Sequence, residues 1–125
     1  MRVMSDVRNS YLCQIPNANA AFVPGEKLTD YLLNEQHPVG KSKAKWFTSL
    51  GYDVGDSGRL EKDLLTLVQA SEDYVEKASS FGTKYIVSGK ISSPSGRDAN
   101  VTTVWIIESP GGAPRLVTAY PGEKP

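Results

Sequence analysis

The apolar positions in the middle of the chain recur at helical spacing. The clearest stripe has the intervals i, i+4, i+7 and i+8 and consists of Leu60, Leu64, Leu67 and Val68. Residues that far apart share one face of a helix, so the stripe predicts a helix over residues 59–70 with one buried side.

Two shorter helices are predicted ahead of it. Residues 24–33 begin with Pro24, which suits a first turn, and end before Pro38. Residues 40–50 form the next candidate, and Gly51 is its expected stop. Before residue 24 the chain reads as an irregular lead over residues 1–19, followed by a short extended piece.

The pattern changes to β-type runs separated by turn residues after residue 80. Residues 83–91, 100–108 and 115–120 are rich in β-branched and aromatic side chains. Residues 73–79 fit either a continuation of the long helix or a further strand. Helices followed by strands with short links predict an α+β fold with an antiparallel meander.

The length of 125 residues is that of one domain. We expect the domain to cover residues 20–121 and the tail 122–125 to be frayed. Lys+Arg 14 and Asp+Glu 14 give a net charge of zero, so any site for a polyanion must be a local patch.

Cysteine and histidine occur once each, as Cys13 and His37. One cysteine excludes an internal disulfide framework, and the pair cannot fill a tetrahedral zinc shell. A hard-cation site built from carboxylates stays possible, but the acidic residues do not have the spacing of a calcium loop, and we expect neither a metal site nor a cofactor. There is no apolar run of 18 residues and no secretory signal pattern at the start, so we expect a cytoplasmic protein without a membrane span.

The helix predicted over residues 40–50 carries the main candidate chemistry. Lys43 falls in its apolar arc, where a lysine either snorkels to water or serves as a functional ammonium facing the sheet. Lys41 and Lys45 form either a solvated face or, with the helix N-terminus, a phosphate cradle. His37, in the preceding loop, is either a surface residue or a general acid or base.

The strands add further candidates. A period of two places Thr103 and Trp105 on one face of their strand, and places Leu116, Thr118 and Tyr120 together on one face of the last strand. Thr118 and Tyr120 are either ordinary strand residues or side chains beside a reacting phosphate. Trp105, like Trp46, is either a core residue or an anchor for a partner.

Three blocks of sequence together resemble a family of small bacterial domains that occur alone or at the C-termini of polymorphic toxins. The blocks are KLTDYLLN at 27–34, HPVGKSKAKWF at 37–47, and ANVTTVWII at 99–107 with PRLVTAYP at 114–121. The resemblance covers about residues 15–121. In that family the region matching 73–79 looks like a strand, which implies about three helices followed by four antiparallel strands.

The family in turn is similar to the group of metal-independent ribonuclease toxins that includes barnase, EndoU, the colicin tRNases and RelE. That likeness implies cleavage of RNA, which could be tRNA, and control by a cognate antitoxin or immunity protein, with no action on DNA or membranes. It implies catalytic roles for His37, Lys43, Thr118 and Tyr120.

The contacts with RNA phosphates implied by the same likeness involve four residues, Lys41, Lys45, Thr103 and Arg115. Two alternatives remain open at this point. The chain could be a non-enzymatic binding module, one half of a protein pair that docks through Trp46, Trp105 and Tyr120, or a catalytically dead relative.

Overall fold

The computed structural model describes residues 15–28, 41–52, 55, 57–71 and 74–122, with the side chains of residues 41–43 left outside the description. Four strands form one antiparallel sheet in the order β2-β3-β4-β5, so each strand pairs with its neighbour in sequence. Their bounds are β2 Val75–Ser79, β3 Gly82–Ser92, β4 Asp98–Ile107 and β5 Arg115–Pro121. The predicted meander is confirmed, and residues 75–79 are a strand.

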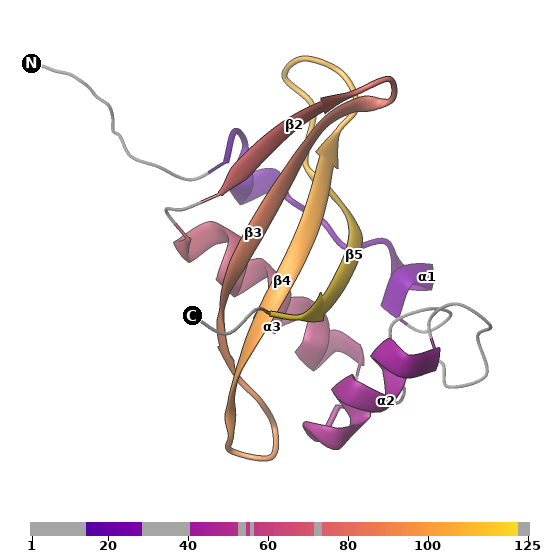
Figure 1. Ribbon diagram of the computed structural model, residues 1–125, viewed down its shortest axis with the longest axis vertical. Helices are drawn as coiled ribbons and strands as arrows, with labels where there is room; N and C mark the ends of the chain where they lie inside the picture. The colour runs from indigo at the N-terminus through magenta and orange to yellow at the C-terminus, as the bar shows by residue number, and fades with distance from the viewer. Residues whose placement is uncertain (1–14, 29–40, 53–54, 56, 72–73, 123–125) are drawn as a thin grey trace, which may run out of the picture.

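The helices precede the sheet in the chain, as expected (Figure 1). They are the 3-10 turn η1 Ala18–Ala20, α1 Gly25–Lys27, α2 Lys41–Ser49 and α3 Ser57–Ala70. The prediction for residues 24–33 is confirmed only in its first turn, and residues 29–33 lie outside the described residues. Gly51 ends α2 with a φ of +101°, a conformation that glycine adopts without strain.

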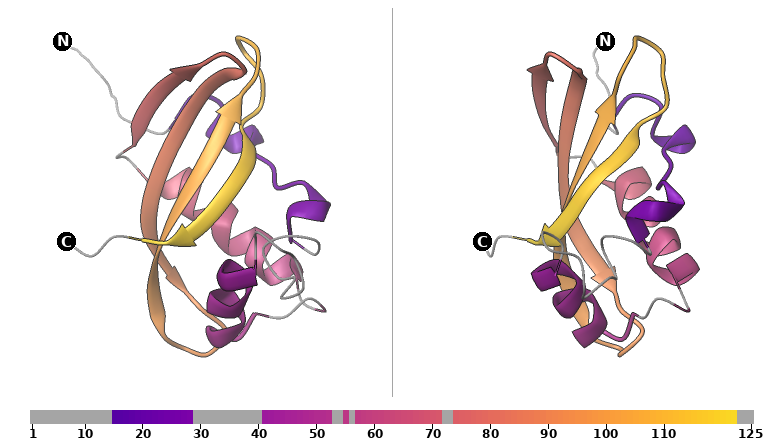
Figure 2. Two further views of the ribbon diagram at one scale, coloured as in Figure 1. Left: turned by 45° about the vertical axis from the view of Figure 1, so that its right-hand side comes forward. Right: turned by 90° about the vertical axis from the view of Figure 1, so that its right-hand side faces the viewer.

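One face of the sheet is covered by α3, which crosses behind it in Figure 1 and lies to one side of it in both views of Figure 2. The stripe predicted from sequence is buried in this interface: Leu60, Leu64, Leu67 and Val68. Gly89 of β3 lets the helix approach closely, because a Cβ at this position would lie 3.1 Å from Cγ of Leu67.

The described end of the N-terminal lead packs against the same core. Ile15 and Ala18 are 3% and 2% exposed. Phe22 then forms a parallel bridge with Arg115: its amide donates to the carbonyl of Pro114 and its carbonyl accepts from the amide of Leu116. The extended piece predicted after residue 19 therefore runs along the free edge of β5.

An internal hydrogen-bond network ties α3 to the end of β3. The Tyr52 hydroxyl donates to Asp63 at 2.5 Å, Arg59 pairs with Asp63 at 2.9 Å, and Arg59 also donates to the carbonyl of Ser92. Burial, followed by the bond to Asp63, raises the pKa of Tyr52 well above its usual range. A pocket of about 410 Å³ lies beside this network, between α3 and β3.

Candidate functional site

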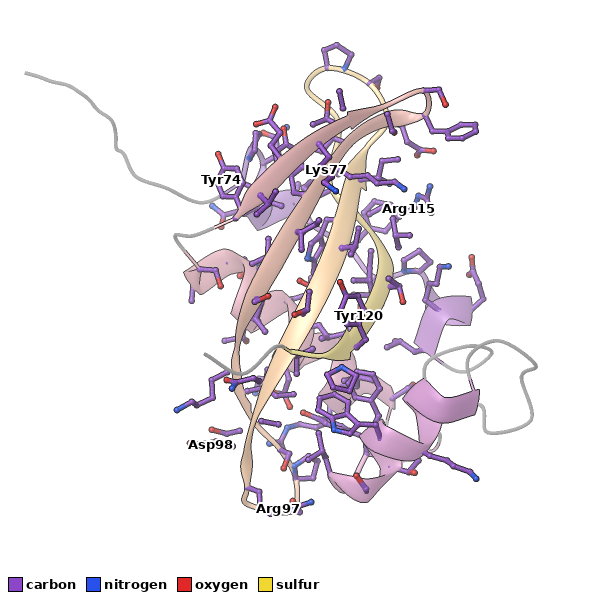
Figure 3. The ribbon with its side chains drawn as sticks, viewed as in Figure 1. Tyr74, Lys77, Arg97, Asp98, Arg115 and Tyr120 are labelled. Atoms are coloured by element: carbon purple, nitrogen blue, oxygen red, sulfur yellow. The ribbon has the colours of Figure 1, made fainter. Side chains whose placement is uncertain are left out.

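The face of the sheet that points away from α3 carries the polar side chains of the strands. We call it the outer face. Its members follow from the strand register and from the burial of the alternate residues in the core, and they include Val75, Lys77, Lys84, Ile86, Ser88, Lys90, Asn100, Thr102, Val104, Ile106, Arg115, Thr118 and Tyr120. Figure 3 looks onto this face.

A β-bulge in β5 decides which residues reach the outer face. Trp105 pairs with Leu116, but the preceding residue, Val104, pairs with Thr118, so the register shifts by one residue at Val117. Leu116 therefore faces the core, at 0% exposure, whereas Thr118 and Tyr120 face outward. The expectation that Leu116, Thr118 and Tyr120 share one face is wrong, because a bulge inserts one residue and reverses the alternation.

Thr118 has an unusual environment on this face. Its Oγ1 is buried and has no hydrogen-bond partner within the part of the chain that the structure describes. A buried hydroxyl without a partner costs about 1–3 kcal/mol. Such a group calls for a specific explanation, and a water or ligand that completes its hydrogen bonding is one.

Tyr120 lies one row farther along the same face. It pairs across the strands with Thr102, which is 5% exposed and shares a hydrogen bond of 2.8 Å with Ser88. Three hydroxyl groups, from Ser88, Thr102 and Tyr120, thus follow one another across β3, β4 and β5. Hydroxyls both donate and accept hydrogen bonds, so the row suits a polar ligand.

Arg115 provides the positive charge of β5. Its guanidinium pairs with Glu108 at 3.1 Å, and both side chains remain in contact with water. The N–H groups of a guanidinium can form bidentate hydrogen bonds with a phosphate. The exposed carboxylate of Glu108 is paired with the Arg115 guanidinium, so an anionic ligand would have to displace Glu108 in order to bind Arg115.

Helix α2 lies beside the C-terminal end of β5, close to Tyr120 in Figure 3 and adjacent in every view of the ribbon. The structure therefore brings together two segments singled out in the sequence. Lys45 is exposed and Trp46 is half-buried, with its ring 4.9 Å from that of Phe47. The side chains of Lys41 and Lys43, and the whole of His37, lie outside the described residues.

Two further candidates face the core instead. Thr103 is 0% exposed, donates to the carbonyl of Val87 at 2.8 Å and accepts from Nε1 of Trp105 at 2.7 Å. Trp105 is equally buried, which favours the core role over the role of partner anchor. We leave Thr103 and Trp105 out of the candidate site because both side chains are buried on the helix-covered face.

Sequence reasoning missed several outer-face residues, among them Lys77, Lys84, Ser88 and Thr102. A signal was present in β3, where Lys84, Ser88 and Lys90 alternate with the apolar residues Tyr85, Val87 and Ile91. The sequence of β2 carried no such signal. All five residues of this strand are exposed, so it has no buried face that would require apolar and polar residues to alternate.

The described residues contain no group of three or more His, Cys, Asp or Glu side chains that could hold a metal ion. Among the same residues, no helix is long and apolar enough to cross a membrane.

Comparison with known proteins identifies the family. The model of the family described as a domain of unknown function (DUF6883) matches residues 14–123, which is most of the chain. The chain belongs to this family. No protein with a curated description matches this DUF6883 domain.

A solved structure shares the fold of this DUF6883 domain. It is titled "Contact-dependent growth inhibition toxin - immunity protein complex from Klebsiella pneumoniae 342". The matched chain has a TM-score of 0.66 and 19% identity, and the alignment covers 86% of this chain and 98% of that chain. At this identity the likeness concerns the fold alone.

Proposed function

We propose that this domain is a toxin that cleaves RNA without a metal ion and is held in check by an inhibitory partner protein. The observation that carries the proposal is the bulge in β5, because it turns Thr118 and Tyr120 onto the face that already holds Arg115. The fold shared with a chain of a toxin–immunity complex supports the toxin role and the partner.

The proposed reaction uses the nucleophile that RNA carries itself. A base takes the proton of a 2′-hydroxyl, and the 2′-oxygen attacks the adjacent phosphorus. The bond from phosphorus to the 5′-oxygen breaks, and an acid protonates the leaving oxygen. The products are a 2′,3′-cyclic phosphate and a free 5′-hydroxyl. DNA lacks the 2′-hydroxyl and would remain intact.

Thr118 and Tyr120 are proposed to donate hydrogen bonds to the phosphate as its charge grows in the transition state. The unpartnered Oγ1 of Thr118 is suited to this role, because it has no bond within the described protein to give up. Arg115 is proposed to bind a phosphate oxygen after releasing Glu108.

The segment around α2 is proposed to supply the proton transfers. His37 would act as the base or the acid, and Lys43 would stabilise the charged phosphorane. Lys41, at the start of α2, and Lys45, one turn later, would position the RNA backbone. The position of α2 beside the end of β5 supports these assignments.

The decisive experiment combines cell growth with a purified assay. The chain is expressed in bacteria as wild type, His37→Ala, Lys43→Ala and Thr118→Val, and growth and RNA integrity are followed. Purified protein is then incubated with cellular RNA, including tRNA, and with DNA in the presence of EDTA. We expect RNA cleavage by the wild type only, with 2′,3′-cyclic phosphate ends, and intact DNA.

A matched control is Lys62→Ala, which removes an exposed lysine from α3 on the opposite side of the sheet. It should cleave RNA like the wild type. Cleavage that EDTA abolishes, or equal cleavage of DNA, would contradict the mechanism. Absence of any cleavage would contradict the enzymatic proposal itself.

A second proposal is a binding module that acts as one half of a protein pair. The observation in its favour is the hairpin of β2 and β3, on which Phe81 is 76% exposed and Val75 is 54% exposed. Exposed apolar side chains on an edge hairpin are typical of partner contacts. A chain that binds a partner tightly, leaves all RNA intact and loses the partner in Phe81→Ser would favour this function.

A further inference from the structure

Three cationic side chains stand in one row across the outer face, and the row runs from Arg115 of the proposed site to the opposite edge of the sheet at β2. In register, Lys77 of β2 is opposite Lys84 of β3, Lys84 is opposite Ile106 of β4, and Ile106 is opposite Arg115 of β5. We call Lys77, Lys84 and Arg115 the cation row. Figure 3 shows its two ends, Lys77 and Arg115, on the viewer's side of the sheet.

The pairing of Lys77 with Lys84 is unfavourable for the folded protein by itself. Like charges directly opposite each other on neighbouring strands repel and destabilise a sheet. The chain has equal numbers of acidic and basic residues, so carboxylates for a balanced pair were available. Two lysines in this register concentrate positive charge at one place on the outer face, which an anion bound there would neutralise.

Ile106 of β4 lies between Lys84 and Arg115 in the row. Ile106 is 4% exposed, while its neighbours Lys84 and Arg115 are each half-buried. This is the arrangement expected where aliphatic stems cover an apolar side chain and the charged ends stay in water. The charged end of Lys84 is thus within reach of a ligand lying on the sheet, whereas that of Arg115 becomes available only when the ligand displaces Glu108.

The row is aligned with the proposed site of cleavage. Neighbouring strands lie about 4.8 Å apart, so the row spans about 14 Å, enough for more than one phosphate of a nucleic-acid backbone. Thr118 pairs with Val104, which lies two residues from Ile106 along β4 and hence about 7 Å from the row.

We propose that the cation row is a track for the sugar–phosphate backbone of the RNA, with Lys77 and Lys84 as binding residues remote from the bond that is cut. This inference rests on the proposed function, since it extends the same face from β5 to β2. Phosphate contacts of this kind fix the position of a strand without reading its sequence. Lys77 and Lys84 would therefore act on affinity and leave the chemical step unchanged.

The test separates binding from cleavage. A single-stranded RNA oligonucleotide that the wild type cleaves, or otherwise a mixed-sequence one, is prepared with every 2′-hydroxyl methylated so that it cannot react. Its affinity is measured by fluorescence anisotropy at several salt concentrations for wild type, Lys77→Gln, Lys84→Gln and the double variant. Lys62→Gln on α3 is the matched control. Steady-state cleavage of the unmodified RNA is measured in parallel.

We expect each substitution in the track to weaken binding several-fold and to reduce the slope of log K against log salt by about 0.7. KM should rise while kcat stays unchanged, as for a residue that binds substrate and transition state equally. The melting temperature of Lys77→Gln should not fall, because the change relieves a like-charge contact. Lys62→Gln should match the wild type in every measurement.

The outcomes distinguish this proposal from the function on which it rests. RNA cleavage with unchanged KM and salt slope in both variants would overturn the track and leave the ribonuclease intact. Binding that depends on Lys77 and Lys84, without cleavage of any RNA, would support the track and overturn the ribonuclease. Failure of the wild type to bind the oligonucleotide would overturn the track.

Discussion

At Thr118 the folded protein carries a buried hydroxyl without a partner among the described residues. Valine has nearly the same shape and lacks this hydroxyl. We expect Thr118→Val to keep or raise the free energy of unfolding, by up to about 1–3 kcal/mol, because the cost of the unsatisfied group disappears. RNA cleavage should fall strongly in the same variant.

Urea denaturation and a cleavage assay on the same samples check this prediction. Thr118→Ser retains the hydroxyl and should preserve a larger part of the activity. A variant that is less stable than the wild type but equally active would show that the Thr118 side chain serves the fold and not the reaction.

Tyr52 offers a prediction with a defined pH dependence. Its pKa is raised in the folded state by burial and by the hydrogen bond to Asp63, while the unfolded chain ionises near pH 10. The stability that this group contributes is therefore complete below about pH 10 and decreases as the pH rises above it. Tyr52→Phe removes both the bond and the titration.

We expect Tyr52→Phe to be less stable than the wild type by about 1–3 kcal/mol at pH 7. The difference should narrow above pH 10. Urea midpoints at pH 7 and pH 10.5 measure both effects, and the raised pKa of Tyr85, which is common to the two proteins, cancels in the difference. A constant difference across this range would refute the account.

At the scale of elements, the β2–β3 hairpin depends on one glycine. Gly82 has a φ of +136°, and a Cβ at this position would overlap the carbonyl oxygen of Ile107 on β4. Gly82→Ala is expected to destabilise the protein by at least about 1–3 kcal/mol, because it adds backbone strain and forces β3 away from β4. Thermal unfolding monitored by circular dichroism measures the loss.

Gly58 provides the control for that prediction. It lies in the first turn of α3 and a Cβ there would meet no atom within 4 Å. Gly58→Ala should raise stability by about 0.5–1 kcal/mol, since alanine favours the helix. Equal effects of the two substitutions would contradict the role assigned to Gly82.

At the scale of the whole molecule, the N-terminal segment is part of the fold. Ile15 is 3% exposed within the core, and Asn17 donates to the carbonyl of Gly112 in the loop before β5. Ile15→Ala should lower the free energy of unfolding by about 2–5 kcal/mol, as expected for a buried isoleucine. Asn19→Ala, at an exposed position nearby, should change it by less than about 0.5 kcal/mol.

Urea denaturation of the two variants beside the wild type decides the point. If Ile15→Ala unfolds at the wild-type midpoint, the lead does not contribute to the core in solution. The match of the family model from residue 14 onward agrees with a structural role for this segment.

The helices and strands themselves were largely determined by the sequence. The stripe of α3 and the runs of β3, β4 and β5 are local patterns, since the period of 3.6 or 2 residues places apolar side chains on one side of an element wherever it packs. The order of helices before strands, the stop at Gly51 and the burial of Leu64 followed from these patterns.

The candidate site was decided by tertiary structure. Which face of the sheet remains uncovered depends on where α3 packs, and the orientation of Thr118 depends on a bulge at Val117 that no local pattern reveals. The opposition of Lys77 and Lys84 likewise exists only once β2 pairs with β3. Strand pairing joins residues through backbone hydrogen bonds whose register is set by the packing of the whole sheet, so the site emerges only when the sheet is assembled.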